Sequence, residues 1–193
     1  MSGAVKTIAD VAAQPFTSVA DAVHALSAVG DRGIWSDGRL TPWSDAVRAV
    51  AVRIAALRDL MGSSSSQSRT TTTTQTAPPA RPPHVGLLLA GTPEYLHLLG
   101  AAACSELVVA GLNPTRRGEA LARDAALADC ALILTDTDNE ALLDGLGPDV
   151  QVVNVDSPEW AALLDRHADA ALPAVADVPT GPDDLVALVF TSG

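Results

Sequence analysis

The sequence predicts an α/β domain, with a doubly wound, mostly parallel sheet covered by helices on both faces. The second half of the chain alternates short apolar runs with amphipathic segments. The apolar runs start at residues 85, 107, 131 and 150, and spacings of 22, 24 and 19 residues suit β-α-β units. The runs are apolar along their whole length, as expected for strands buried on both faces.

Five strands are expected in this half, with helices between them. We place the strands at 85–90, 107–110, 131–135, 150–155 and 185–190, the helices at 93–104, 117–127 and 158–168, and a helical turn near 139–146. Thr92-Pro93-Glu94 and Ser157-Pro158-Glu159 open two helices with the same device. Each offers a capping hydroxyl, a proline with no donor to lose, and an acid near the positive helix end.

The N-terminal part predicts a helix and a hairpin. Residues 1–16 carry no clear signal and are expected to form a loose lead-in to a domain over 17–193. Apolar residues recur every three or four positions over 17–29, which predicts a helix. Asp37-Gly38 is typical of a hairpin turn.

A long helix and a low-complexity segment follow the hairpin. Thr41 is expected to cap the helix, Pro42 to lie in its first turn and Gly62 to end it. Residues 63–83 contain runs of serine, threonine and proline, which bury too little apolar surface to offset the entropy lost on ordering. We interpret them as a disordered loop, more readily a tolerated insertion than a phosphorylated or partner-binding tract.

The composition excludes several classes of protein. Twelve basic against 23 acidic residues give a net charge of −11, which argues against nucleic acid and anionic membranes as partners. Two cysteines are too few for a disulfide scaffold or a zinc site. Neither a secretory signal nor an apolar run of about 20 residues is found. The sequence therefore predicts a cytoplasmic protein without a transmembrane segment.

A ligand site is expected beyond the carboxyl ends of the strands. Thr191, Ser192 and Gly193 follow the last strand, and such residues can begin a phosphate-binding loop, because glycine lets backbone N–H groups approach oxygen atoms and hydroxyls add donors. Arg116 and Arg117 follow another strand. They either meet a phosphate or, more often for such a pair, lie at the surface in a first helical turn near Glu119.

The other candidates have structural interpretations, so we assign no catalytic residue and no metal ligand. The cysteines are interpreted as small buried residues, His97 and His167 as structural, and the tryptophans as packing residues. His24 and His84 show no partner pattern, and Asp136 and Asp138 form a loop pair without further metal-binding residues beside them. The residues concerned are Cys104, Cys130, His24, His84, His97, His167, Trp35, Trp43 and Trp160.

Several ordered blocks resemble a known family. They are Gly91-Thr92-Pro93-Glu94-Tyr95, the block 111–119 with Asn113-Pro114-Thr115-Arg116-Arg117, the block 153–160, and the final block 182–193. In this order they resemble the N-terminal part of the acyl-adenylate-forming ligases of the AMP-binding superfamily, and among these the bacterial long-chain fatty-acyl-CoA ligases. The resemblance covers residues 17–193 apart from the low-complexity segment.

The resemblance implies that a fatty acid, ATP with Mg²⁺, and coenzyme A are converted to acyl-CoA, AMP and pyrophosphate through an acyl-adenylate. Thr191, Ser192 and Gly193 would then begin the ATP phosphate loop, which continues in the family as T-S-G-[ST]-T-G-x-P-K. The 193 residues lack that lysine, the acyl tunnel and the C-terminal domain with its catalytic lysine. We therefore expect a fragment, cut inside the phosphate loop, that is inactive alone and binds these cofactors poorly.

Two alternatives stay open. The chain can be a non-catalytic protein that binds a partner through the face exposed by truncation, or a fragment of another adenylate-forming enzyme, such as a peptide-synthetase adenylation domain or a luciferase-like enzyme. The arginine pair after Asn-Pro-Thr favours the acyl-CoA ligases. An exposed edge of the strand 185–190 predicts a marginally stable, aggregation-prone product.

Overall fold

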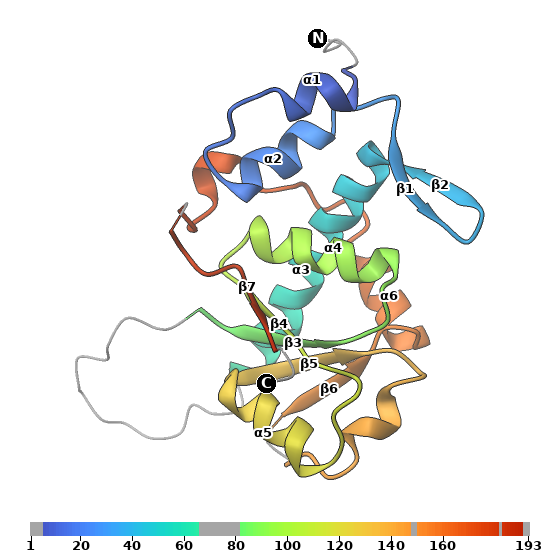
Figure 1. Ribbon diagram of the computed structural model, residues 1–193, viewed down its shortest axis with the longest axis vertical. Coiled ribbons are helices and arrows are strands. Elements are labelled where there is room, and N and C mark those ends of the chain that lie inside the picture. The colour runs from blue at the N-terminus through green and yellow to red at the C-terminus, as the bar shows by residue number, and fades with distance from the viewer. Residues whose placement is uncertain (1–5, 66–81, 148–149, 182, 191–193) are drawn as a thin grey trace.

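The computed structural model describes residues 6–65, 82–147, 150–181 and 183–190. Helices and strands follow one another in the order shown in Figure 1. The elements are α1 (Ile8–Ala12), α2 (Val19–Leu26), β1 (Gly33–Ser36), β2 (Arg39–Pro42), α3 (Trp43–Ser65), β3 (His84–Leu88), α4 (Pro93–Ala103), β4 (Val108–Gly111), α5 (Glu119–Leu127), β5 (Cys130–Thr135), the 3₁₀ turn η1 (Glu140–Leu143), β6 (Gln151–Asn154), α6 (Pro158–Arg166), the 3₁₀ turn η2 (Val175–Asp177) and β7 (Ala187–Val189).

The main sheet has five strands in the order β6-β5-β3-β4-β7, and every neighbouring pair is parallel. The chain passes from β3 to β4 on one side and then returns to place β5 on the other side of β3. The sheet is therefore wound in both directions, which confirms the predicted fold class. In such sheets, the reversal leaves a crevice at the carboxyl ends of the strands on either side of it, here β3 and β5.

Helices cover both faces of the sheet. Leu87, Val109 and Leu134 face one core, which the helices α2, α3, α4 and α6 complete. Their sequence neighbours Leu88 and Ala110 face a second core with helix α5 and turn η1. Alternate residues of one strand thus enter opposite layers, which is why the strands are apolar throughout.

The N-terminal residues are more ordered than the sequence predicted. Helix α1 lies inside the expected lead-in, because Thr7 and Asp10 form a reciprocal capping box: the Thr7 amide donates to Asp10 Oδ2 (2.9 Å) and the Asp10 amide to Thr7 Oγ1 (3.2 Å). The Ile8 amide also donates to Asp31 Oδ1 at 2.9 Å, which ties the helix to the segment after α2.

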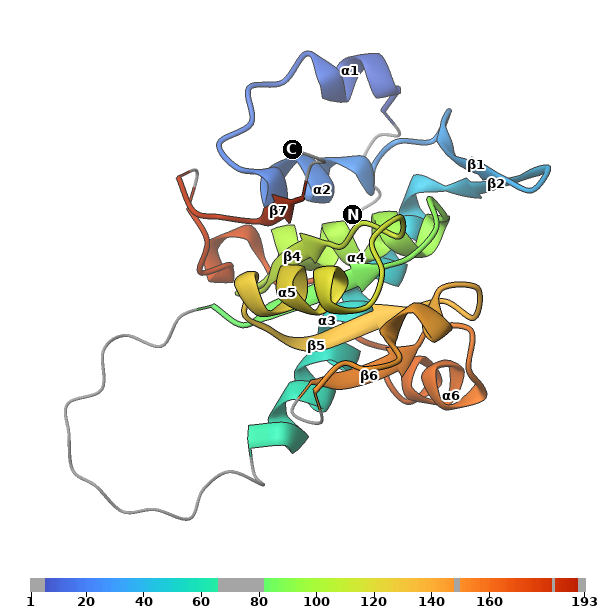
Figure 2. The same cartoon turned by 60° about the horizontal axis from the view of Figure 1, so that its bottom comes forward.

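The hairpin formed by β1 and β2 projects from the body of the molecule (Figures 1 and 2). Asp37 and Gly38 have φ values of 50° and 74°, which confirms the predicted turn, since two positive φ values are those of a type I′ turn. Trp35 is 70% exposed on this hairpin, so its interpretation as a packing residue was wrong.

Both predicted ends of the long helix were also wrong. Thr41 and Pro42 belong to strand β2, and helix α3 starts at Trp43 and continues past Gly62 to Ser65. Gly62 is not among the glycines with positive φ, so it weakens the helix without ending it. The first serines of the segment 63–83 are thus helical, while residues 66–81 lie outside the described residues.

The two matching helix starts behave differently. Ser157 Oγ accepts a hydrogen bond from the Trp160 amide at 3.1 Å and caps α6 as predicted. Thr92 is the N-cap residue of α4, but its hydroxyl makes no capping hydrogen bond. In the described part of the chain, no helix is long and apolar enough to cross a membrane.

Candidate functional site

The loops that follow β3, β4 and β5 come together at one edge of the sheet, because the strands are parallel. These loops contain residues 89–92, 112–118 and 136–139. Strand β7 lies beside β4 with Val189 opposite Gly111, so Phe190 also follows a strand at this edge. Thr191, Ser192 and Gly193, the predicted start of a phosphate loop, lie outside the described residues, and their role stays a prediction.

Asp136 ties two of these loops together. Its Oδ2 accepts a hydrogen bond from the Ala90 amide (2.7 Å), and its Oδ1 accepts from the amide (2.9 Å) and the side-chain Nδ2 (2.7 Å) of Asn139. The carboxylate therefore bridges the end of β3 and the turn after β5, which are the two sides of the crevice. Because Asp136 follows a buried strand, the sequence placed it at this edge of the sheet, but it did not predict that the carboxylate bridges two loops.

A hollow of about 420 Å³ opens between the loops after β3 and β5 and helix α6. Asp136, Asp138 and Asp156 contribute carboxylates to its lining, while Leu89, Val155 and Leu164 are apolar lining residues. The hollow lies where the winding of the sheet reverses, the usual place for a ligand in an open α/β sheet.

An ion pair lies in the wall of this hollow. Arg53 on α3 donates from Nη2 to Glu94 Oε2 (2.6 Å) and from Nε to Glu94 Oε1 (3.1 Å), and Trp160 Nε1 donates to Oε1 at 3.2 Å. Burial alone would raise the pKa of Glu94, but the attraction of His97 and of Arg53 outweighs it, so that the pKa lies below its usual value. The carboxylate thus stays ionised and joins α3, α4 and α6.

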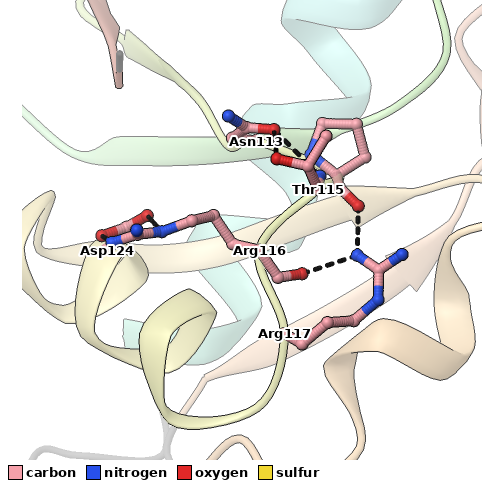
Figure 3. A network of polar contacts seen from close by, with 6 residues as sticks. Asn113, Thr115, Arg116, Arg117 and Asp124 are labelled. Carbon is pink, nitrogen blue, oxygen red and sulfur yellow. Dashed lines mark hydrogen bonds and ion pairs between the residues drawn. The ribbon is translucent and has the colours of Figure 1, made fainter. Parts of the chain in front are cut away.

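The arginine pair after β4 is turned toward its own chain (Figure 3). Arg116 pairs with Asp124 on α5 through Nε (3.0 Å) and Nη2 (3.2 Å), and the Asp124 side chain is only 7% exposed. Arg117 Nη1 donates to the carbonyl oxygens of Pro114 and Arg116. Both arginines precede α5, so their expected place in its first turn beside Glu119 was wrong.

Tyr95 is a residue of this edge that the sequence analysis did not single out as a site residue. A Cβ atom added to Gly111, at the end of β4, would lie only 2.9 Å from Tyr95 Oη. The glycine therefore leaves room for a phenol hydroxyl that reaches from α4 to the carboxyl end of β4, beside β7. The sequence pattern could have placed Tyr95 on the buried face of α4, because it precedes the buried residues Leu98 and Ala102 by three and seven positions.

The cysteines are buried as predicted, and His24 and His167 contact groups of the chain itself. Burial raises the pKa of the Cys104 thiol to about 11, and burial together with the charge of Asp129 does the same for Cys130. His24 Nε2 lies 2.7 Å from the Pro173 carbonyl oxygen, and His167 Nε2 lies 3.3 Å from Asp59 Oδ2. Among the described residues, no group of three or more histidine, cysteine or acidic side chains is arranged to hold a metal ion.

The sequence pattern of the AMP-binding enzymes matches residues 80–193, more than half of the chain. The chain therefore belongs to the AMP-binding enzyme family, as the ordered blocks indicated. It is 40% identical over 168 residues to the medium/long-chain-fatty-acid–CoA ligase FadD17 of Mycobacterium marinum, which covers 87% of this chain and 29% of that protein.

Other relatives agree with this membership. The FadD17 ligase of Mycobacterium tuberculosis is 40% identical over 177 residues, or 91% of this chain and 30% of its own length. The steroid-22-oyl-CoA synthetase of Rhodococcus jostii is 43% identical over 115 residues, or 58% of this chain and 20% of its own length. The chain thus spans about 30% or less of the length of these curated relatives.

Solved structures show the same fold. The complex of VinN with 3-methylaspartate superposes with a TM-score of 0.71 at 19% identity, covering 93% of this chain and 46% of VinN. The N-terminal domain of FACL13 from Mycobacterium tuberculosis superposes with a TM-score of 0.66 at 19% identity, covering 92% of this chain and 42% of that one. The predicted relation to the N-terminal domain of adenylate-forming enzymes is confirmed at the level of the fold.

Proposed function

We propose that these residues form the N-terminal part of an ATP-dependent fatty-acyl-CoA ligase, which converts a fatty acid, ATP and coenzyme A to acyl-CoA, AMP and pyrophosphate through an acyl-adenylate. The 40% identity to the FadD17 ligases over about nine tenths of the chain carries this proposal. The match covers more of the chain than the family blocks alone, because 177 residues are aligned.

The described residues fit a supporting role in such an enzyme. The cationic side chains of the β4–α5 loop, Arg116 and Arg117, are engaged by Asp124 and by backbone carbonyls. The formation of an acyl-adenylate gathers negative charge on phosphates and requires fixed cations, N–H donors and a metal ion. We propose that ATP and Mg²⁺ are held by the loop that starts at Thr191, Ser192 and Gly193 together with residues beyond these 193.

It follows that a polypeptide of these 193 residues alone does not activate acyl groups. The test compares this polypeptide with the product of the longest reading frame that contains it. Medium- and long-chain fatty acids are supplied with ATP, Mg²⁺ and coenzyme A, and both acyl-CoA and ATP–pyrophosphate exchange are measured. We expect both signals from the longer product and neither from the 193 residues. Exchange by the 193 residues above a boiled control would contradict the inactivity, and a longer product without acyl-CoA formation would contradict the assignment.

A second candidate substrate is the carboxylate of a steroid side chain. The 43% identity to a steroid-22-oyl-CoA synthetase favours it, although that match covers only 58% of this chain. Competition between a steroid carboxylic acid and a fatty acid for the longer product separates the two, since the preferred acid has the higher kcat/KM. Preference for the steroid acid would replace the fatty acid in our proposal and leave the ligase reaction unchanged.

A further inference from the structure

The hollow of about 420 Å³ beside α6 takes no part in the ligase chemistry proposed above, and its charge is unlike that of a phosphate site. Three aspartates line it, and the one arginine in the described lining, Arg53, is engaged by Glu94. Within the described parts of the chain, no basic side chain forms an ion pair with Asp136, Asp138 or Asp156. Three negative charges therefore line one hollow without a cation to balance them.

Hydrogen bonds from the backbone hold two of these carboxylates in place. Asp136 accepts from the Ala90 amide, as described above, and Asp156 Oδ2 accepts from the Thr137 amide at 2.9 Å. The Asp138 carboxylate and Oδ1 of Asp156 accept no hydrogen bond from the described residues. The loops after β3, β5 and β6 are thus joined to one another, while acceptor atoms remain available to a ligand.

The apolar part of the lining lies deeper than the carboxylates. Leu89 and Trp160 are only 7% and 3% exposed, whereas Asp138 and Asp156 are exposed residues. A volume of about 420 Å³ is within the range of small-molecule sites, which are mostly apolar and carry a few polar groups that orient the ligand. The hollow therefore suits a molecule with an apolar body and one polar end.

The charge of the lining defines that polar end. Three carboxylates repel phosphates and carboxylic acids and attract cations. A bare metal ion does not fit, because no group of three or more acidic, histidine or cysteine side chains in the described residues is arranged to hold one. An ammonium group carries a positive charge and three N–H donors, which match the free carboxylate oxygens, and its apolar body would cover the deeper part of the lining.

We propose that this hollow binds a small primary amine in its ammonium form. The ammonium group lies beside Asp138 and Asp156, and the apolar body lies against Leu89, Val155 and Leu164. This binding does not depend on the formation of an acyl-adenylate, so it stands or falls independently of the proposed ligase activity.

Three probes with the same six-carbon chain test the proposal on the 193-residue chain: hexylammonium, hexan-1-ol and hexanoate at neutral pH. Indole N–H signals are followed by ¹⁵N–¹H NMR, with Trp160 as the reporter because it lines the hollow, and with Trp35 and Trp43 as references outside it. We expect hexylammonium to shift the Trp160 signal saturably, hexan-1-ol to bind about five- to tenfold more weakly, and hexanoate not to bind. Added salt should weaken the binding of hexylammonium but not that of hexan-1-ol.

A pair of charge variants locates the ammonium group. Asp138→Asn should weaken hexylammonium about two- to threefold and leave hexan-1-ol unchanged, because it removes one charge from the lining. Asp144→Asn removes the same charge from an exposed residue outside the lining and should have a smaller effect. Equal weakening by both substitutions would mean that only the net charge of the chain matters, and would overturn the proposed position.

A pair of size variants locates the apolar body. Ala161→Leu adds three carbon atoms to a lining residue of α6 and should weaken both hexylammonium and hexan-1-ol, whereas Ala162→Leu makes the same change outside the lining and should weaken neither. The proposal is overturned if hexan-1-ol or hexanoate binds as tightly as hexylammonium. A linear shift shared by all three indoles would overturn it as well, because it would show only a solvent effect.

Discussion

Arg53 and Glu94 lie 41 residues apart in sequence and form a two-point ion pair that joins α3 to the first turn of α4. Their side chains are 14% and 18% exposed. Trp160 adds a third helix to the same carboxylate. The ion pair thus holds the start of α4, and the loop after β3 that precedes it, at the wall of the hollow beside α6.

Removal of Arg53 should therefore destabilise the fold strongly. Arg53→Met leaves the largely buried Glu94 carboxylate without its cation, and we expect the free energy of unfolding to fall by about 3 kcal/mol in urea titrations. Arg58→Met is the matched control, because Arg58 pairs with Glu106 in an exposed position, where the loss should stay below about 1 kcal/mol. Equal losses from both substitutions would contradict the special role of the Arg53 pair.

The depressed pKa of Glu94 predicts a dependence of stability on pH. Its pKa in the folded chain lies below the ordinary 4.5, because His97 and Arg53 outweigh the opposing effect of burial. A carboxyl group with a lowered folded pKa contributes stability that is fully present above its unfolded pKa and lost as the pH falls through the folded value. The stability difference between the wild-type chain and Glu94→Gln should therefore shrink below pH 4.5. A difference that grows on acidification would show the wrong sign for this ion pair.

Asp136→Ala should loosen the crevice between β3 and β5. The substitution leaves the Ala90 amide and both Asn139 donors without their acceptor, and we expect a loss of about 1–3 kcal/mol in the free energy of unfolding. Hydrogen exchange at the Ala90 amide should accelerate as well. Asp138→Ala, at an exposed neighbouring position, should cost less than about 0.5 kcal/mol. Unchanged exchange at Ala90 would rule out the bridging role of Asp136.

Both cysteines should react only when the chain opens. Their thiols are buried and their pKa values are raised to about 11, so little thiolate forms and little of it is accessible at neutral pH. The reaction with an aromatic disulfide reagent should be slow in buffer and should accelerate in parallel with unfolding as urea is added. Rapid labelling of the folded chain would contradict the packing interpretation.

Strand β7 should mediate self-association of the 193-residue chain. It forms one edge of the sheet, and Val189 on it is 75% exposed. Val189→Lys should reduce the association measured by sedimentation, because a lysine on an edge strand opposes pairing with another chain. Val152→Lys on the opposite edge strand, β6, where the valine is 38% exposed, should have a smaller effect. Equal effects of the two substitutions would place the contact elsewhere.

The sequence by itself determined the fold class and most elements of this protein. Continuous apolar runs identified the five strands of the main sheet within two residues at each end, because burial on both faces leaves a strong local signal. Asp37-Gly38 identified the hairpin turn for an equally local reason. The ordered family blocks, which include Tyr95, Asn113 and Pro114, identified the family.

Only the tertiary structure decided which polar groups meet. Arg53 and Glu94, Asp136 and Ala90, and Arg116 and Asp124 are separated by 41, 46 and 8 positions, and no local pattern indicates these pairings. Asp124, the partner of Arg116, lies in the second turn of the next helix, so the sequence did not indicate this pairing. Hydrogen bonds and ion pairs between distant segments follow from the relative placement of helices and strands, which the packing of side chains in three dimensions sets.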